Sequence, residues 1–283
     1  MPELTLGQYE LVYNLLSLSI AAMLASFVFF ILGRQQVAPV YRISLIVSAL
    51  VVGIAGYHYI RIFQSWEAAY VLNAAGDAYI ASGKPFNDAY RYVDWLLTVP
   101  LLMVELVLVL RLAPNVARPL MVKLVVAAVL MIGLGYPGEI IRGETSMFSE
   151  RGLWGFLSTI PFVYILYVLW VELGESIKRQ PPKAAKLIRN IRLLTLATWG
   201  FYPIAYMAPF FGLSGGVAEV SLQVGYSIAD IAAKCGYGVM IYHIARAKTE
   251  ADGEYVLTGK AIDTGTDAVP APATKSQEAA TTA

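Results

Sequence analysis

Two ionisable residues, Asp230 and Lys234, stand four positions apart within the last long apolar stretch of the sequence. On a helix this spacing puts both side chains on one face. An ionisable residue deep in a membrane span costs roughly 2.5 to 3.5 kcal/mol on insertion scales, so each needs a partner or a function. One interpretation is an intrahelical salt bridge that offsets two unfavourable insertions. The other is chemical, because a desolvated lysine amine is a nucleophile that forms an imine with an aldehyde.

A protonated imine is a buried cation, and it requires carboxylates close by. Asp230 supplies one, and Asp94 in an earlier apolar stretch is the second candidate. Arg91 lies one helical turn before Asp94 and favours its ionised form, and Thr98 lies one turn beyond it.

Glu105 follows Asp94 by eleven residues, close to three helical turns, so both carboxyls share one face about 16 Å apart. Leucine and valine surround Glu105 in the sequence, and desolvation there favours its protonated form. One carboxyl is thus suited to accept a proton and the other to donate one. The alternative is that Glu105 is a boundary residue whose head group reaches the membrane interface.

Composition places these residues in a membrane protein. Of 283 residues, 58% are hydrophobic and 14% are charged, which is typical of a multispanning protein. The net charge of +1 gives no case for a nucleic-acid partner. The sole cysteine, Cys235, excludes an intrachain disulfide framework and a cysteine-rich metal site, so we expect no metal. The start of the sequence lacks a basic signal-peptide region, so we expect the first apolar stretch to be retained as a helix.

Apolar stretches of about 20 residues recur along the chain, as spanning helices require. We therefore expect an all-α membrane protein with a bundle of seven transmembrane helices. The stretches are Tyr9 to Leu32, Val40 to Ile62, Ala89 to Leu110, Leu120 to Ile141, Leu153 to Leu173, Ile188 to Phe211 and Val217 to Ala245.

Basic residues gather in alternate links, above all between the fifth and sixth stretches, and cytoplasmic flanks retain Lys and Arg. We therefore expect the N-terminus outside and the C-terminus inside the cell. Residues 69–73 and 78–81 are expected to form a small extracellular hairpin. Residues 1–248 form the predicted transmembrane domain, and residues 249–283 are expected to be a disordered cytoplasmic tail.

Three segments together resemble the microbial (type 1) rhodopsins, in the form of the proteorhodopsin and xanthorhodopsin proton pumps. The similarity extends from about Tyr9 to about Ala247. The segments are Arg-Tyr-Val-Asp-Trp-Leu-Leu-Thr from Arg91 to Thr98 with Pro100, Leu102 and Glu105 after it, then Trp199, Tyr202 and Pro203, and finally Asp-Ile-Ala-Ala-Lys from Asp230 to Lys234.

The resemblance implies a role for each matching residue. Lys234 would carry all-trans retinal as a protonated Schiff base, and Asp94 would be its primary counterion and proton acceptor. Asp230 would be the second counterion, and Glu105 the cytoplasmic proton donor. Arg91 would be the gate toward the outside, and Thr98 would form a hydrogen bond near Asp94. The Asp-Thr-Glu triplet marks outward proton pumps of the family, whereas its sodium and chloride pumps carry other triplets.

The resemblance also implies the walls of the retinal pocket. For any single aromatic residue among them the alternative is ordinary core packing. Pro100 and Pro203 lie in the middle of spans, where proline bends a helix. The expected wall residues are Trp95, Leu102, Ser158, Thr159, Phe162, Trp199, Tyr202 and Tyr206.

Three further positions carry implications from the resemblance. His58 is expected to pair with Asp94, unless it is only bonded to a neighbouring helix. Gly155 would leave an opening beside the retinal ring for a hydroxylated carotenoid antenna, unless it serves close helix packing. Leu222 stands where haloarchaeal pumps carry a glutamate of the proton release pair, so release must use another route, for which Glu219 is only a guess.

The expected function is light-driven outward proton transport across the cell membrane, by a multi-pass transporter that is not an enzyme. Its partners would be membrane lipid, protons and further copies of itself in a pentamer or trimer. A photosensor that signals through a partner protein is the first alternative, although a sensor gains nothing from a fast donor such as Glu105. The second alternative is a transporter or receptor without a chromophore, in which Asp230 and Lys234 merely form a salt bridge.

Overall fold

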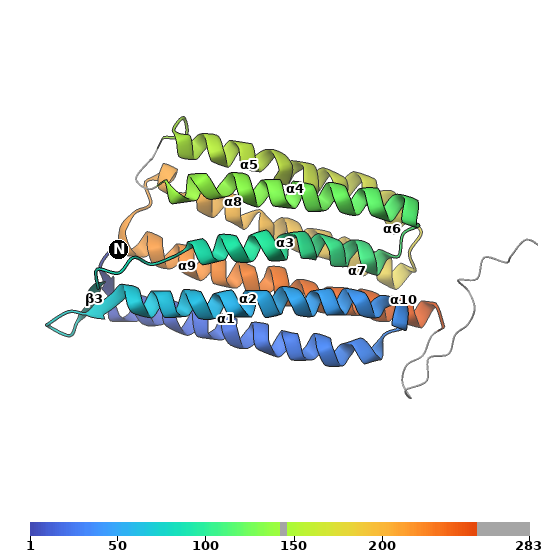
Figure 1. The fold of residues 1–283 in the computed structure, drawn as a ribbon, viewed down its shortest axis with the longest axis horizontal. Coiled ribbons are helices and arrows are strands. Elements are labelled where there is room, and N and C mark those ends of the chain that lie inside the picture. Colours follow the sequence, from blue (N-terminus) through green and yellow to red (C-terminus); the bar gives the residue numbers. More distant parts are fainter. Residues whose placement is uncertain (142–145, 254–283) are drawn as a thin grey trace, which may run out of the picture.

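The computed structural model describes residues 1–141 and 146–253, and these form an elongated bundle of helices that run side by side (Figure 1). Seven passes along the bundle can be followed in the described residues. The first four are α1 (Leu6–Gly33), α2 (Arg42–Ala69), α3 (Ala89–Leu110) and α4 (Pro114–Ile140). The last three are α5 (Glu150–Tyr167) with η3 (Val168–Glu172) and α6 (Leu173–Ile177), α7 (Pro182–Trp199) with α8 (Phe201–Tyr206), and α9 (Gly215–Asp230) with η5 (Ile231–Gly236) and α10 (Tyr237–Ala251).

The first five passes in the described residues are long and apolar enough to cross a membrane. The sixth and seventh are interrupted. Pro203 has no N–H to donate to the carbonyl of Trp199, four residues earlier, and the sixth pass breaks between these two residues. In the seventh pass the interruption is the π-helical turn η5, which contains Lys234. The predicted seven-helix architecture is thus confirmed.

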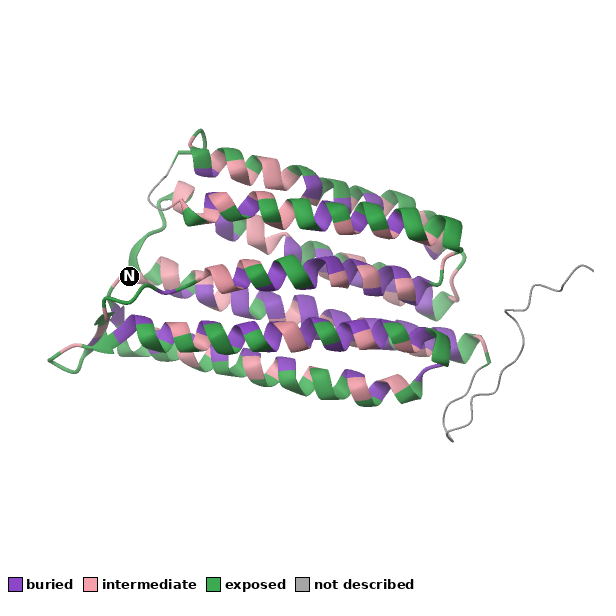
Figure 2. Ribbon diagram, in the orientation of Figure 1, coloured by how far each residue is buried: buried purple, intermediate pink, exposed green. Residues whose placement is uncertain are grey.

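The outer faces of the bundle are apolar. On α1 the exposed side chains include Leu11, Leu18, Leu24, Val28 and Leu32. Figure 2 shows exposed residues on the outward faces of α1, α4 and α5, whereas buried residues concentrate on α2, α3 and the seventh pass. An apolar exterior around a bundle with buried polar groups is the arrangement that a lipid bilayer requires.

A small sheet closes one end of the bundle, which we call the hairpin end. β2 (Tyr70–Leu72) and β3 (Ala78–Ala81) are antiparallel, as the sequence predicts, and the Asn73 side chain accepts backbone N–H bonds in their turn. A third strand, β1 (Leu4–Thr5), pairs with β3 and was not predicted, because two residues show no alternating pattern. Short 3₁₀ turns, η1 (Arg34–Gln36), η2 (Pro39–Tyr41) and η4 (Ala208–Phe211), lie in the links.

Helix ends differ from the predicted stretches where polar residues continue a helix. α2 runs to Ala69 beyond Ile62, and α7 begins at Pro182 before Ile188. Apolar length alone does not detect such polar turns. α10 continues to Ala251, and the rest of the predicted tail from residue 254 onward lies outside the described residues.

Candidate functional site

Lys234 lies in the middle of the bundle between two carboxylates. Its Nζ is 3.0 Å from Oδ2 of Asp94 on α3 and 2.9 Å from Oδ1 of Asp230 at the end of α9. All three side chains are at most 2% exposed. The two acids that the sequence singles out are therefore brought together on one amine from different helices.

The two carboxylates differ in their hydrogen bonds. Among the described residues Asp230 accepts from the hydroxyls of Tyr59 and Tyr202 and from the indole N–H of Trp95. Oδ1 of Asp94 accepts no hydrogen bond within the described residues. The three donors to Asp230 stabilise its ionised form. Oδ1 of Asp94, by contrast, can accept a proton without losing a hydrogen bond to the described residues.

Arg91 is directed away from Asp94. Its guanidinium donates to Asp88 at 3.0 Å, to the hydroxyl of Tyr59 at 3.1 Å and to Oε1 of Gln223 at 2.6 Å. Nη1 lies 4.0 Å from Oδ2 of Asp230. In the described part of the chain no ion pair joins Arg91 to Asp94, although the sequence suggests one from their spacing.

Thr98 and His58 lie beside this group. Thr98 is buried, and its hydroxyl donates to the backbone carbonyl of Asp94 at 2.8 Å, not to the carboxylate. His58 is also buried on α2, and its Nδ1 has no hydrogen-bond partner among the described residues. Nδ1 therefore forms no hydrogen bond to Asp94, and the expected pairing of His58 with Asp94 stays a prediction.

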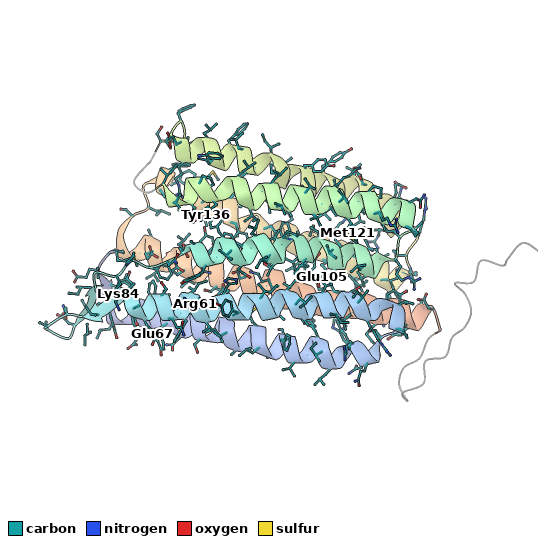
Figure 3. The ribbon with its side chains drawn as sticks, viewed as in Figure 1. Arg61, Glu67, Lys84, Glu105, Met121 and Tyr136 are labelled. Carbon is teal, nitrogen blue, oxygen red and sulfur yellow. The ribbon has the colours of Figure 1, made fainter. Side chains whose placement is uncertain are left out.

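Glu105 is fully buried on α3, in the half of the bundle nearer α6 and α10 (Figure 3). The hydroxyl of Ser48 on α2 donates to its Oε2, and Oε1 has no hydrogen-bond partner in the described residues. A carboxyl that is buried with one neutral donor, and that forms no ion pair with the described residues, is costly to ionise. Since none of Glu105 is exposed, its head group does not reach the surface of the bundle.

A cavity of about 450 Å³ is lined by Lys234 and extends between α3, α4, α5 and α8. Such a volume is within the usual range for small-molecule sites, roughly 300 to 1,000 Å³. The lining is mainly aromatic and aliphatic, and Lys234 supplies the one amine among the described lining residues, so the site fits a long apolar aldehyde. The predicted wall residues that line it are Trp95, Leu102, Ser158, Thr159, Phe162, Trp199, Tyr202, Tyr206 and Gly155.

Gly155 also has a packing function. A Cβ placed there would lie 2.6 Å from Cε1 of Tyr206, closer than side chains allow. The ring of Tyr206 is held by its hydroxyl, which donates to the carbonyl of Arg151 at 2.8 Å. Both interpretations of Gly155, close helix packing and an opening beside the cavity, are compatible with this geometry.

Sequence reasoning missed three residues of the site, Ser48, Tyr59 and Gln223. Each is buried and bonded to a predicted site residue. Their sequence signal is weak, because Ser, Tyr and Gln are neutral and cost less than charges within a span. Polar residues on the same helical face as a predicted site residue are the feature that would identify them.

Comparisons with known proteins agree with this geometry. The family model described as bacteriorhodopsin-like protein matches residues 11–248. The green-light absorbing proteorhodopsin of Gamma-proteobacterium EBAC31A08 is 34% identical over 226 residues, which are 80% of this chain and 82% of the relative. The bacteriorhodopsin of Halobacterium salinarum is 30% identical over 53% of this chain and 54% of the relative.

Two solved structures are similar in fold and sequence. The crystallographic structure of xanthorhodopsin, described as a light-driven ion pump with dual chromophore, has a TM-score of 0.85 and 60% identity, and the match covers 89% of this chain and 99% of that one. The crystal structure of thermophilic rhodopsin has a TM-score of 0.85 and 54% identity over the same shares. With a buried lysine between two carboxylates at the end of an apolar cavity, and a family model that matches most of its length, the chain belongs to the bacteriorhodopsin-like protein family.

Proposed function

We propose that the protein is a light-driven outward proton pump of the cell membrane, a multi-pass transporter and not an enzyme. The observation that carries the proposal is Nζ of Lys234 between Asp94 and Asp230, with the buried carboxyl of Glu105 in the other half of α3. Relatives in the family include proteorhodopsins and a light-driven ion pump, which supports the assignment.

All-trans retinal fits the cavity as the chromophore, attached to Lys234. When bound as a Schiff base it supplies light absorption and a change of shape that alters the surroundings of Nζ. The protein then moves the proton. Nζ of Lys234 gives it to Asp94, while Asp230 remains ionised because Tyr59, Tyr202 and Trp95 donate to it. Glu105 afterwards returns a proton to Nζ from the opposite side, as its buried neutral form allows.

The direction of transport follows from the proposed orientation. The hairpin end would face the outside, and the opposite end, with the basic link between α6 and α7, would face the cytoplasm. Asp94 lies nearer the hairpin end of α3 than Glu105, so transfer through Asp94 carries protons outward. A photosensor, by contrast, would not need Glu105 as a second buried carboxyl that returns a proton to Nζ.

Illumination of retinal-supplied cells in unbuffered medium tests the proposal. The medium should become more acidic, and a protonophore should abolish the change because it collapses the gradient. Cells that express no pump are the control. A coloured protein that produces no acidification, with a photocycle lasting seconds, would instead favour a sensor.

Replacing Glu105 with glutamine should slow the return of the proton to Nζ by about 10²-fold, since a positioned proton donor typically contributes that much. Flash spectroscopy measures this rate, and the colour of the resting protein should hardly change. Ser48→Ala keeps the carboxyl but removes its hydrogen bond, so a smaller slowing is expected. An unchanged rate in Glu105→Gln would remove Glu105 as donor.

A hydroxylated carotenoid is proposed as a second chromophore beside Gly155. The cavity is lined there by a glycine, which has no side chain, and it extends between α4, α5 and α8. Gly155→Leu should abolish energy transfer from an added carotenoid, measured as the carotenoid bands in the excitation spectrum. Gly133→Leu is the matched control, since no atom lies within 4 Å of a Cβ placed at that exposed glycine of α4. Energy transfer that persists in Gly155→Leu contradicts this placement.

We further propose that the protein works in lipid as a homo-oligomer, either a pentamer or a trimer. The apolar outer faces of α1, α4 and α5 offer surface both for lipid and for neighbouring copies. Native mass spectrometry of the detergent-solubilised pigment measures the number of copies, and a monomer would reject the proposal.

A further inference from the structure

Arg151, near the start of α5, connects the ends of three passes at the hairpin end. Its Nη1 donates to the backbone carbonyl of Gly138 near the end of α4 at 3.0 Å, and its Nη2 donates to the backbone carbonyl of Tyr206 at the end of α8 at 3.0 Å. Nη2 also lies 3.1 Å from Oε2 of Glu139. The last carbonyls of a helix have no partner within that helix, so this buried guanidinium satisfies groups that are otherwise costly to bury.

The side chain of Tyr206 is held from several directions. The guanidinium of Arg151 lies over the ring, with Cζ 4.2 Å from the ring centroid, and the hydroxyl donates to the backbone carbonyl of Arg151 at 2.8 Å. Two glycines make room for the ring. A Cβ at Gly155 would lie 2.6 Å from Cε1, and a Cβ at Gly138 would overlap the hydroxyl. The side chain and the main chain of Arg151 therefore both fix the same aromatic ring.

This pair of residues lies where two cavities of different character adjoin. Tyr206 lines the apolar cavity of about 450 Å³ that Lys234 also lines. Arg151 lines a second cavity of about 410 Å³ at the hairpin end, together with Asp88 and Glu139, and we call this second one the polar cavity. Because the guanidinium rests on the ring, the pair presents a phenol to the first cavity and a cation to the second.

A wall at this place has a chemical use when retinal occupies the apolar cavity. Water hydrolyses the bond between a lysine amine and an aldehyde, so the cavity has to keep water out. Water would also weaken the attraction between Nζ of Lys234 and its two carboxylates, because it raises the local dielectric constant. An aromatic ring held in one orientation excludes water without filling the space that the polyene needs.

We infer that Arg151 is a positioning residue, which holds the ring of Tyr206 as the wall between the retinal cavity and the polar cavity. The inference rests on the proposed function, because it requires retinal in the first cavity. Tyr206 belongs to the described lining of that cavity and Arg151 does not, so Arg151 acts through the ring. The wall keeps out water and small polar solutes that enter from the polar cavity.

Hydroxylamine in the dark tests the wall, because this small polar nucleophile removes retinal from the lysine as an oxime and so bleaches the pigment. The retinal-loaded full-length protein in lipid nanodiscs is mixed with hydroxylamine, and the loss of the visible band is timed. In Arg151→Leu the bleaching rate should rise by about tenfold, because the cation–π contact and the hydrogen bond from the guanidinium no longer hold the ring.

Arg151→Lys keeps the charge but loses the planar group that stacks on the ring, so its bleaching rate should lie between those of the unaltered protein and Arg151→Leu. This variant also carries the test if Arg151→Leu does not fold.

Arg192→Leu is the matched control. The guanidinium of Arg192 also lies over an aromatic ring, that of Trp170, and donates to the backbone carbonyl of Leu169 at 3.0 Å. Arg192 is outside the described lining of both cavities. Its loss should lower the unfolding temperature about as much as the loss of Arg151, and it should leave the bleaching rate unchanged.

Tyr206→Ala removes the ring itself and should bleach at least as fast as Arg151→Leu. The double variant should bleach no faster than Tyr206→Ala alone, because Arg151 has no ring left to hold. A normal rate in the Arg151 variants that form pigment would overturn the inference, as would equal acceleration in Arg192→Leu or additive acceleration in the double variant. If the unaltered protein forms no pigment with retinal, the proposed function itself fails.

Discussion

Lys234→Ala should yield a colourless protein after addition of all-trans retinal, because no other amine is placed at the end of the cavity among the described residues. The visible absorbance band should be lost completely, and borohydride should attach no retinal to the chain. Absorption spectroscopy and peptide mass spectrometry provide the measurement. Removing the amine also leaves Asp94 without an ion-pair partner among the described residues and Asp230 with only Arg91 at 4.0 Å, and breaking a buried pair in this way costs about 3 to 5 kcal/mol.

Lys234→Arg is the variant that separates chemistry from stability. A guanidinium keeps a positive charge between Asp94 and Asp230 but forms no imine with retinal. We therefore expect a folded and colourless protein, with a higher unfolding temperature than Lys234→Ala. A visible band in Lys234→Arg that survives denaturation would mean that retinal is attached elsewhere, and the proposed site would be wrong.

Asp94→Asn should lower light-driven acidification by about 10²-fold or more, since the amide cannot accept the proton from Nζ. It should also shift the absorption band to the red. The positive charge at Nζ loses one of two carboxylates at about 3 Å, which changes the energy of the chromophore. The spectrum and the rate of acidification measure both effects.

Asp77→Asn in the turn of the hairpin is a suitable control for Asp94→Asn. Asp77 is an exposed carboxylate bonded to Asn73, far along the chain from the amine, so its loss should change neither colour nor transport. If Asp94→Asn kept the original colour, the counterion assignment would be wrong. If the colour shifted but acidification persisted, Asp230 would be the acceptor instead.

The sequence predicts the charged centre of the site well, because charges within apolar stretches are rare and each demands a partner. This reasoning identifies Asp94, Asp230 and Lys234, and in the structure both carboxylates lie within 3.0 Å of Nζ of Lys234. The seven-helix architecture was predictable for a similar reason, since spanning segments require long apolar runs.

The hydrogen bonds of these charges were not predictable from spacing along one helix. Arg91 lies one turn from Asp94, yet its guanidinium turns to Tyr59 and Gln223 on other helices. Ser48 and Tyr59 are neutral residues on α2, and only packing against α3 and α9 gives them their partners. Contacts between helices depend on rotation about each helix axis, which the apolar pattern specifies only coarsely.

The π-helical turn η5 has a consequence for protein engineering. Such a turn accommodates an additional residue relative to an α-helix, in which each residue advances by about 100°. Deleting one residue within Ile231–Gly236 would therefore leave the following residues facing as they do, whereas deleting one from the regular helix α9 would rotate everything after it by roughly that angle. Tyr237 and Ile241, both fully buried, would then turn away from the core. Chimeras that exchange this pass with a relative should therefore be joined outside Ile231–Gly236, so that the winding of this turn is inherited intact.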